Sequence, residues 1–466
     1  MFKPQTYQQR REALIKGLAA RGVKKGLVAV IGNEESPMSY HDNTYPFRQD
    51  SSFLYFFGPS KPGLAASIDV GTGKTVLYGD DPSLDDIVWT GPETSVAELA
   101  KAAGMDEAKP RGKLAAAAKK AAPLLFFPPY RADARVELAE FLGTAPAAVD
   151  EAASIPLIRA AVELREIKSA EEIAEMELAV ETSVAMHRAA MAMAKPGLRE
   201  SDIMAKVNEV ALAAGGAEGG SGISFPSIAT TAGATLHNHL YGKTLKAGGL
   251  FLLDAGAERP SGYAGDLTST FPIGTHYDKR QRSIYEIVLA MGDSAKAILK
   301  PGLPFLKAHE AAARAMVEGF KELGLMKGDT DEAVAAGAYA LFFVHGLGHQ
   351  IGLDVHDMEN YGEQWVGYDG GERSSLFGLK SLRLAKPLKA GMVHSVEPGV
   401  YFIPALIAEW KKEKKFSDFI NYDKIGPYLD FGGVRNEEDW LITPKGARRL
   451  GPSFDKSIEA MEAARA

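Results

Sequence analysis

Three histidines stand close together in the segment HGLGHQIGLDVHD, at positions His345, His349 and His356. The whole chain of 466 residues has only ten histidines, so this segment concentrates groups that bind metals or transfer protons. Glycines in the segment let the backbone approach a site closely, although they weaken a helical interpretation of the His345–His349 spacing. A single histidine here would be interpreted as structural, but three, with Asp357 beside the last, indicate a functional site.

Two aspartates lie in neighbouring apolar segments, Asp254 at the end of LFLLD and Asp266 in GDLTSTF. A carboxylate at the inner end of an apolar strand is costly unless it is paired, hydrogen-bonded or bound to a metal. The two segments are joined by a turn, and a hairpin would bring both carboxylates together. Taken singly, each aspartate is better explained as a residue that caps a turn through local backbone bonds.

Two glutamate positions extend the acidic set. Glu397 stands in SVEPGVYF, and Glu437 and Glu438 follow GGVRN. Taken singly, these glutamates fit a turn and a solvated acidic cluster. Taken together, one histidine and four carboxylates form a hard, oxygen-rich ligand set suited to Mn²⁺ or similar ions, and four negative charges match two divalent cations. This candidate set is Asp254, Asp266, His349, Glu397 and Glu437.

The composition excludes several classes of protein and of site. The chain has no cysteine, which rules out disulfides, thiolate zinc sites, iron–sulfur clusters and a thiol nucleophile. The net charge of −7 argues against a general nucleic-acid binder, which would carry a basic face. The apolar runs are too short to span a bilayer and the first residues are polar, so we expect a soluble, cytoplasmic protein with no membrane partner.

The distribution of apolar residues predicts two domains, with a boundary near residue 160. The first domain, residues 1–160, alternates strand-like and helical segments and reads as α/β. A capping box at Ser169 and Glu172 predicts that a long helix begins there. The second domain, residues 161–466, reads as mixed α and β, with residues 404–430 as a surface insertion. The strands expected are 26–32, 53–58, 75–80, 123–128, 249–257, 262–274, 391–402 and 437–442, and the helices expected are 113–122, 133–142, 278–298, 304–323 and 331–343.

These motifs resemble the pita-bread metallopeptidases, and within them the proline-specific branch that contains aminopeptidase P and prolidase. The resemblance is carried, in family order, by LLDAGAE, GDLTSTF, HGLGHQIGLDVHD, SVEPGVYF and GGVRNEED. It extends to YPFRQDSSFLYFFG, IVWTG and LREIKSAEEI nearer the N-terminus. The resemblance implies an α/β N-terminal aminopeptidase-P-like domain followed by an α+β pita-bread catalytic domain.

The resemblance also implies a role for each candidate. Asp254, Asp266, His349, Glu397 and Glu437 would bind two divalent ions, with Asp266 and Glu437 bridging them. The expected ion is Mn²⁺, with Co²⁺ or Zn²⁺ as alternatives, and a hydroxide held between the two ions would attack the scissile carbonyl. Glu397 would also transfer protons, and His237, His345 and His356 would be catalytic histidines. His237, His345 and Arg435 would also bind substrate, with Arg435 beside the metals. The chain departs from the family pattern at Asn238, Asn436 and Glu438, and His239 competes with His237 for its role.

The function implied is an Xaa-Pro aminopeptidase that also accepts dipeptides. The alternative is a strict Xaa-Pro dipeptidase, a prolidase, in which Arg383 binds the carboxylate of the dipeptide. Arg383 could instead pair with a surface acid. A remote alternative is a non-catalytic pita-bread protein that binds peptides, while creatinase-like chemistry and methionine aminopeptidase are disfavoured. The expected partners are peptides or dipeptides with proline at the second position and other copies of the chain, as a dimer or tetramer.

Overall fold

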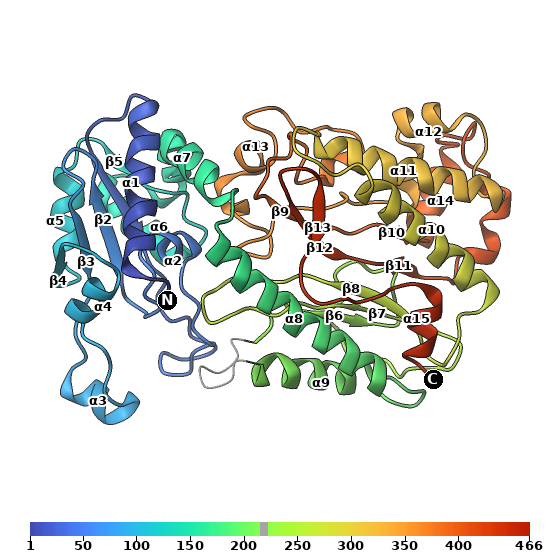
Figure 1. Cartoon of the computed structure of the whole chain (residues 1–466), viewed down its shortest axis with the longest axis horizontal. Helices are drawn as coiled ribbons and strands as arrows, with labels where there is room; N and C mark the ends of the chain where they lie inside the picture. Colours follow the sequence, from blue (N-terminus) through green and yellow to red (C-terminus); the bar gives the residue numbers. More distant parts are fainter. Residues whose placement is uncertain (215–221) are drawn as a thin grey trace. The chain divides into compact units, whose positions relative to one another are not determined.

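The computed structural model of the chain describes residues 1–214 and 222–466 (Figure 1). These residues form two compact units, one of residues 1–165 with 358–365 and one of residues 166–357 with 366–466. Within the described residues, none of the helices combines the length and the apolar character needed to cross a bilayer.

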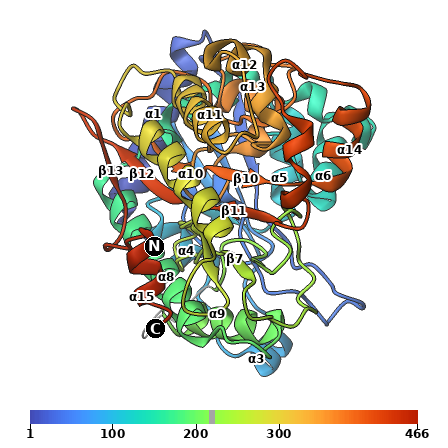
Figure 2. The ribbon, with the colours of Figure 1, turned by 90° about the vertical axis from the view of Figure 1, so that its right-hand side faces the viewer.

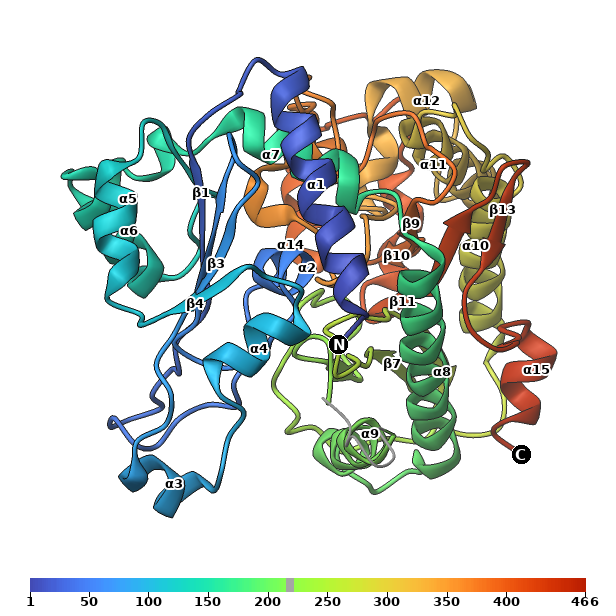
Figure 3. The same cartoon turned by 60° about the vertical axis from the view of Figure 1, so that its left-hand side comes forward.

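The first unit is built on a mixed sheet with the strand order β4-β3-β2-β1-β5. Strands β1, β2 and β3 pair antiparallel, while β4 joins β3 and β5 joins β1 in parallel. In Figure 3, α5 and α6 lie on one side of this sheet and α1 and α4 on the other. The elements are α1 (Pro4–Ala20), β1 (Leu27–Ile31), α2 (Ser51–Phe56), β2 (Ala65–Asp69), β3 (Thr75–Tyr78), α3 (Leu84–Thr90), α4 (Val96–Ala102), β4 (Glu107–Lys109), α5 (Lys113–Lys120), β5 (Leu124–Leu125), α6 (Ala132–Leu142) and α7 (Ile155–Arg165).

The prediction of a strand over residues 53–58 is wrong, because this segment forms helix α2. Asp50 caps the helix by accepting a hydrogen bond from the Phe53 amide at 2.8 Å. Every residue of the helix is buried, so the segment shows no polar stripe from which helical periodicity could be read. At the other end, the guanidinium groups of Arg10 and Arg11 donate to the carbonyls of Tyr55 and Phe56, each at 2.9 Å, and satisfy groups that a helix end leaves open.

The second unit begins with the predicted capping box, which is confirmed. Ser169 and Glu172 exchange the two capping bonds, and α8 runs from there to Met193. The elements are α8 (Ala170–Met193), α9 (Glu200–Ala213), β6 (Ile228–Thr230), β7 (Leu250–Asp254), β8 (Thr268–Pro272), α10 (Lys279–Lys296), α11 (Phe305–Glu322), α12 (Thr330–Ala336), α13 (Glu363–Val366, which begins in the first unit), β9 (Val393–Val396), β10 (Gly399–Tyr401), α14 (Pro404–Lys412), β11 (Gly433–Arg435), β12 (Glu438–Ile442), β13 (Ala447–Arg449) and α15 (Ile458–Ala463).

Three small sheets form the centre of the second unit, with the orders β6-β7-β8, β10-β11 and β13-β12-β9. Helix α9 packs against β6, while α10 packs against β9, β10 and β11 and lies beside α11 (Figure 2). The hairpin expected for the two aspartate segments is present, since β7 pairs antiparallel with β8 and Asp254 lies opposite Thr268. The strand β8 is shorter than the expected 262–274, so Asp266 lies in the loop just before it.

The expectation that residues 404–430 form a surface insertion is only partly right. The segment begins with helix α14, whose charged residues lie outside but whose Ile407 and Trp410 are buried. Ile420 and Ile425, further along, are also buried. The charged WKKEKK run made the segment look like an exposed insertion in the sequence. Its buried apolar residues anchor it in the second unit.

Candidate metal centre

A cavity of about 610 Å³ in the second unit collects the candidate residues. They come from the segment between β6 and β7, the β7–β8 hairpin, the histidine segment, the segment before β9, the end of β9 and the β11–β12 junction, which are far apart in the sequence. Each residue that the sequence singled out for metal binding, catalysis or substrate contact lines this cavity: His237, Asp254, Asp266, His345, His349, His356, Arg383, Glu397, Arg435 and Glu437.

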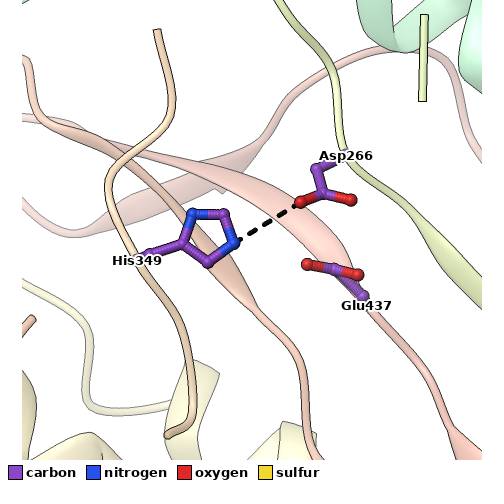
Figure 4. Close-up of side chains that lie close together, drawn as sticks. All are labelled: Asp266, His349 and Glu437. Carbon is purple, nitrogen blue, oxygen red and sulfur yellow. Dashed lines mark ion pairs between the residues drawn. The ribbon is translucent and has the colours of Figure 1, made fainter. Parts of the chain in front are cut away.

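Asp266, His349 and Glu437 form the inner group of the site (Figure 4). All three are buried, and each offers a ligand atom within 4.8 Å of the others. The Nε2 atom of His349 lies 3.4 Å from Oδ2 of Asp266. One imidazole nitrogen and two carboxylates that converge in this way can hold a metal ion.

The neighbours of His349 fix which of its ring nitrogens faces the acids. Nδ1 lies 3.1 Å from the carbonyl oxygen of Gln350, and a carbonyl can only accept, so Nδ1 carries the proton. The lone pair of the neutral ring is then on Nε2, which points toward Asp266 and lies 3.6 Å from Oε1 of Glu397. A backbone carbonyl that orients a histidine through its far nitrogen is a common second layer around metal sites.

Asp254 and Glu397 stand beside this inner group. Asp254 ends β7, and its Oδ2 accepts a hydrogen bond from Nη2 of Arg435 at 2.5 Å. Glu397 follows β9, with its Oε2 3.7 Å from Nδ1 of His345. The five predicted ligands therefore share one cavity, three of them in the tight group and two bordering it.

The acidic groups fit a cation because the protein leaves part of their charge unbalanced. Among the described residues, Oδ1 of Asp254 and Oδ1 of Asp266 are buried with no hydrogen-bond partner. Burial, followed by the charges of Asp254 and Glu397, raises the pKa of Asp266 well above its ordinary value. Burial and Asp266 do the same to the pKa of Glu437, and burial and Glu437 to that of Glu397. A bound divalent ion would reverse this penalty, since it favours the charged carboxylates.

A hydrogen-bonded chain that the sequence did not reveal connects Arg435 to His345. Nη1 of Arg435 donates to the hydroxyl of Tyr401 at 2.7 Å, and this hydroxyl lies 2.9 Å from Nε2 of His345. Because Nδ1 of His345 donates to the carbonyl of Gly346 at 2.7 Å, the tyrosine hydroxyl must donate to Nε2. Burial and then the charge of Arg435 lower the pKa of His345 to about 3, so the ring stays neutral. Tyr401 belongs to the quoted SVEPGVYF motif, but nothing in its spacing indicated this contact.

Three further residues that the sequence did not single out, Thr268, Lys456 and Asp439, support the proposed metal ligands. Thr268 donates its hydroxyl to Oε2 of Glu437 at 2.7 Å and accepts from Nε of Arg435 at 3.1 Å. The buried Lys456 donates to the carbonyls of Thr268 and Glu437 at 2.8 and 2.5 Å, and Asp439 accepts from the backbone amide of Asp266 at 2.9 Å. These residues fix the backbone at two predicted ligands.

The remaining candidates line the more open part of the cavity. The ring of His356 has its centroid 4.0 Å from that of His349. His237 and His239 both line the cavity, so the competition between them stays open. Burial, together with Arg435, lowers the pKa of His237. Arg383 shares this wall with a second arginine, Arg373, which the sequence did not single out.

Residues 174–444 match metallopeptidase family M24, and residues 7–123 match the N-terminal domain of aminopeptidase P. The chain belongs to metallopeptidase family M24. Its fold is therefore a pita-bread catalytic domain preceded by an aminopeptidase-P-type N-terminal domain, which confirms the expected family and fold class. Membership of the family makes the chain a metal-dependent peptidase that uses divalent ions.

Named relatives and solved structures cover nearly the whole chain. A human Xaa-Pro dipeptidase is 30% identical over 449 residues, which are 95% of this chain and 89% of the relative. A probable Xaa-Pro aminopeptidase of Fusarium vanettenii is 31% identical over 418 residues, which are 88% of this chain and 86% of the relative. The structure of the Pseudomonas aeruginosa aminopeptidase PepP aligns with a TM-score of 0.81 and 26% identity, covering 100% of this chain and 98% of that one. A zinc-substituted Escherichia coli aminopeptidase P in complex with product aligns with a TM-score of 0.80 and 28% identity, with the same coverage.

Proposed function

We propose that this chain hydrolyses the peptide bond between an N-terminal residue and a following proline, as an Xaa-Pro aminopeptidase that also accepts dipeptides. The observation that carries the proposal is the convergence of four carboxylates and one imidazole in a single cavity, with two buried carboxylate oxygens left open. The names of the relatives, Xaa-Pro dipeptidase and Xaa-Pro aminopeptidase, supply the class of substrate.

The proposed ligands of two divalent ions are Asp254, Asp266, His349, Glu397 and Glu437. Oxygen-rich sets of this kind suit Mn²⁺, which we take as the resident ion, with Co²⁺ or Zn²⁺ as alternatives. When bound, such ions act as Lewis acids that polarise the scissile carbonyl and lower the pKa of a bound water. Arg435 would hold Asp254 in place, since its guanidinium donates to Asp254, Tyr401 and Thr268.

The side chains around these ligands would handle protons and orient the substrate. Glu397 would accept a proton from the attacking water and deliver it to the proline nitrogen. His356 would donate to the oxygen of the tetrahedral intermediate. The neutral His345 and His237 would form walls around the pyrrolidine ring, whose nitrogen carries no hydrogen for a backbone acceptor.

A specific observation supports dipeptides as substrates. Arg383 lines the same cavity as the acidic group, so the cavity presents a guanidinium that could bind a carboxylate one residue beyond the scissile bond. A guanidinium that binds a carboxylate with two parallel bonds gives both affinity and a limit on substrate length. A strict dipeptidase is therefore the second candidate function.

The deciding experiment compares kcat/KM on Xaa-Pro and on Xaa-Pro-Yaa-Zaa, with added Mn²⁺ and with an Xaa-Ala pair as the control. We expect cleavage after the first residue only when proline follows, and loss of this activity in Asp266→Asn and His349→Gln proteins that still fold. Arg383→Ala should cost the dipeptide about 10- to 100-fold, since a hydrogen bond to a charged group contributes about 1.5–3 kcal/mol, and should cost the longer peptide less.

Arg373→Ala is the matched control, because Arg373 is an exposed arginine that lines the same cavity. A larger loss of dipeptide cleavage in Arg373→Ala than in Arg383→Ala would assign the binding of the substrate carboxylate to Arg373. Equal losses on both substrates in Arg383→Ala would remove the argument for a dipeptide clamp, and cleavage of Xaa-Ala at the same rate would contradict the specificity for proline.

We also propose a domain boundary near residue 160, a cytoplasmic location and a homodimer or homotetramer. Limited proteolysis, cell fractionation and light scattering on the purified protein test these three points separately.

A further inference from the structure

Two buried ion pairs start from one short segment, Glu166 to Lys168, just before the capped start of α8. Both pairs join residues other than the five predicted metal ligands. Each pair connects this segment to a distant part of the chain, 189 positions away for Lys168 and 220 positions away for Glu166. In each distant part, a neighbouring residue lines the cavity. Charges held this far from water are stable only when they are paired, so both contacts constrain the segments that they join.

The first pair reaches the histidine segment. Nζ of Lys168 lies 2.7 Å from Oδ2 of Asp357, and each side chain is only 1% exposed. Asp357 directly follows His356, and its amide donates to the carbonyl of Gln350 at 2.9 Å, which closes the loop between them. The loop is packed so tightly at Gly352 that an added Cβ would lie 2.4 Å from Oδ2 of Asp357. The position of Asp357, and with it that of His356, is therefore set by Lys168.

The second pair reaches the segment that carries Arg383. Nζ of Lys386 lies 2.5 Å from Oε2 of Glu166, and Nζ of Lys389 lies 2.6 Å from Oε1 of the same residue. The side chains of Lys386 and Glu166 are 1% and 2% exposed. The amide of Lys386 also donates to the carbonyl of Gly367 at 2.9 Å, so the backbone three residues after Arg383 is held on two sides.

We propose that Lys168 and Glu166 are positioning residues, Lys168 for His356 through Asp357 and Glu166 for Arg383 through Lys386. This inference deepens the proposed function and rests on it. One segment thereby fixes the two substrate-side parts of the cavity, the group proposed to stabilise the intermediate and the group proposed to bind the carboxylate. Loss of the Lys168–Asp357 pair and loss of the Glu166–Lys386 pair should therefore have different kinetic effects.

The test uses Lys168→Met and Glu166→Gln in the full chain with Mn²⁺ bound. Glu172→Gln is the matched control, because Glu172 is buried in the first turn of α8, accepts a hydrogen bond from the Tyr263 hydroxyl at 2.7 Å and is not among the residues that line the cavity. Loss of exact placement in an active site costs up to about 100-fold. We expect Lys168→Met to lower kcat about 10-fold or more with little change in KM. Glu166→Gln should raise both the KM of the dipeptide and the inhibition constant of the product proline about 10-fold with little change in kcat.

Double-mutant cycles separate positioning from general stability. In a His356→Ala background, Lys168→Met should cause no further loss of kcat, and in an Arg383→Ala background Glu166→Gln should cause no further rise in KM. Lys168→Arg, which keeps the charge, should retain near-normal kcat. Should Lys168→Met not fold, Asp357→Asn carries the same expectation.

Additive losses in these backgrounds, or losses that match those of Glu172→Gln at equal thermal stability, would overturn the inference. A wild-type chain that does not cleave Xaa-Pro bonds would instead contradict the proposed function. Activity in the wild type combined with additive losses would leave that function intact and remove only the positioning role.

Discussion

Replacing Tyr401 with phenylalanine removes a single hydroxyl group from the centre of the chain between Arg435 and His345. The residue is 0% exposed, and its ring can stay in place. The hydroxyl accepts one bond from a guanidinium at 2.7 Å and donates one to a neutral imidazole at 2.9 Å. A bond to a charged group contributes about 1.5–3 kcal/mol and a neutral one about 0.5–1.5 kcal/mol. We therefore expect the free energy of unfolding to fall by about 2–4.5 kcal/mol.

The effect on activity should come from His345 alone. Without the hydroxyl, Nε2 of His345 has lost its donor and the ring is held only through Nδ1, so its placement against the substrate weakens. Loss of the neutral bond and of part of the orientation predicts a decrease in kcat/KM of about 10- to 100-fold, or about 1.4–2.8 kcal/mol. The affinity for Mn²⁺ should change by no more than about threefold, because Arg435 keeps its bonds to Asp254 and Thr268.

The assay measures kcat/KM on an Xaa-Pro dipeptide at saturating Mn²⁺, and the metal affinity by calorimetric titration. Tyr277→Phe is the matched control, since this buried tyrosine donates to the carbonyl of Thr270 at 2.8 Å and does not line the cavity. A Tyr401→Phe protein that loses metal affinity as strongly as activity would show that the chain acts on Asp254 instead. Unchanged activity would refute a role for His345 in the reaction.

Two further predictions concern pH. Mn²⁺ should raise the unfolding temperature by an amount that shrinks as the pH falls from about 8 to about 5, because protons compete with cations for Asp266, Glu397 and Glu437. Their pKa values are raised in the metal-free folded state, so these acids destabilise that state as the pH rises, and a calorimetric gain that does not vary with pH would contradict this. The effect of His309 on the pH dependence of stability has the opposite sign. Burial lowers the pKa of His309 from 6.5 to about 3, so between these pH values the unfolded state binds more protons than the folded state. The free energy of unfolding therefore falls as the pH falls through this range. His309→Phe should flatten that fall by up to about 1.4 kcal/mol per pH unit in urea unfolding, and an unchanged slope would exclude the effect.

The parts of the site that the sequence predicted are those whose residue type alone limits their chemistry. Residue type and position make Asp254, His349 and Glu397 candidates, because a carboxylate that ends an apolar strand is costly without a partner and three histidines share one segment. Only the combination of these residues and the family resemblance assign them to a metal site. The hairpin of β7 and β8 follows from two apolar segments joined by a short turn, whereas its register, with Asp254 opposite Thr268, is seen only in the structure. The strand assigned to residues 53–58 failed because the segment is buried on all sides, where helix and strand patterns are alike.

The missed residues are those whose role depends on a distant partner. Thr268, Tyr401 and Lys456 are common residue types, and the residues beside them in the sequence give no sign of a special role. Their contacts at the site join positions far apart in the chain: Thr268 and Arg435 are 167 residues apart, Tyr401 and Arg435 are 34 apart, and Lys456 and Thr268 are 188 apart. No local pattern distinguishes the Thr268 hydroxyl from that of another threonine in the same strand. Only the fold shows that it lies between an arginine and a glutamate.

The same contacts explain how the protein can hold so much negative charge ready for cations. Arg435 donates a hydrogen bond to one oxygen of Asp254, while the other oxygen has no hydrogen-bond partner. Thr268 donates to Oε2 of Glu437, and the carbonyl of Gln350 accepts from Nδ1 of His349. Each of these three groups is held through one atom, and each residue lines the cavity. The cost of orienting the side chains is therefore met during folding, and only the electrostatic penalty, seen in the raised pKa of Glu437, remains for the ions to relieve.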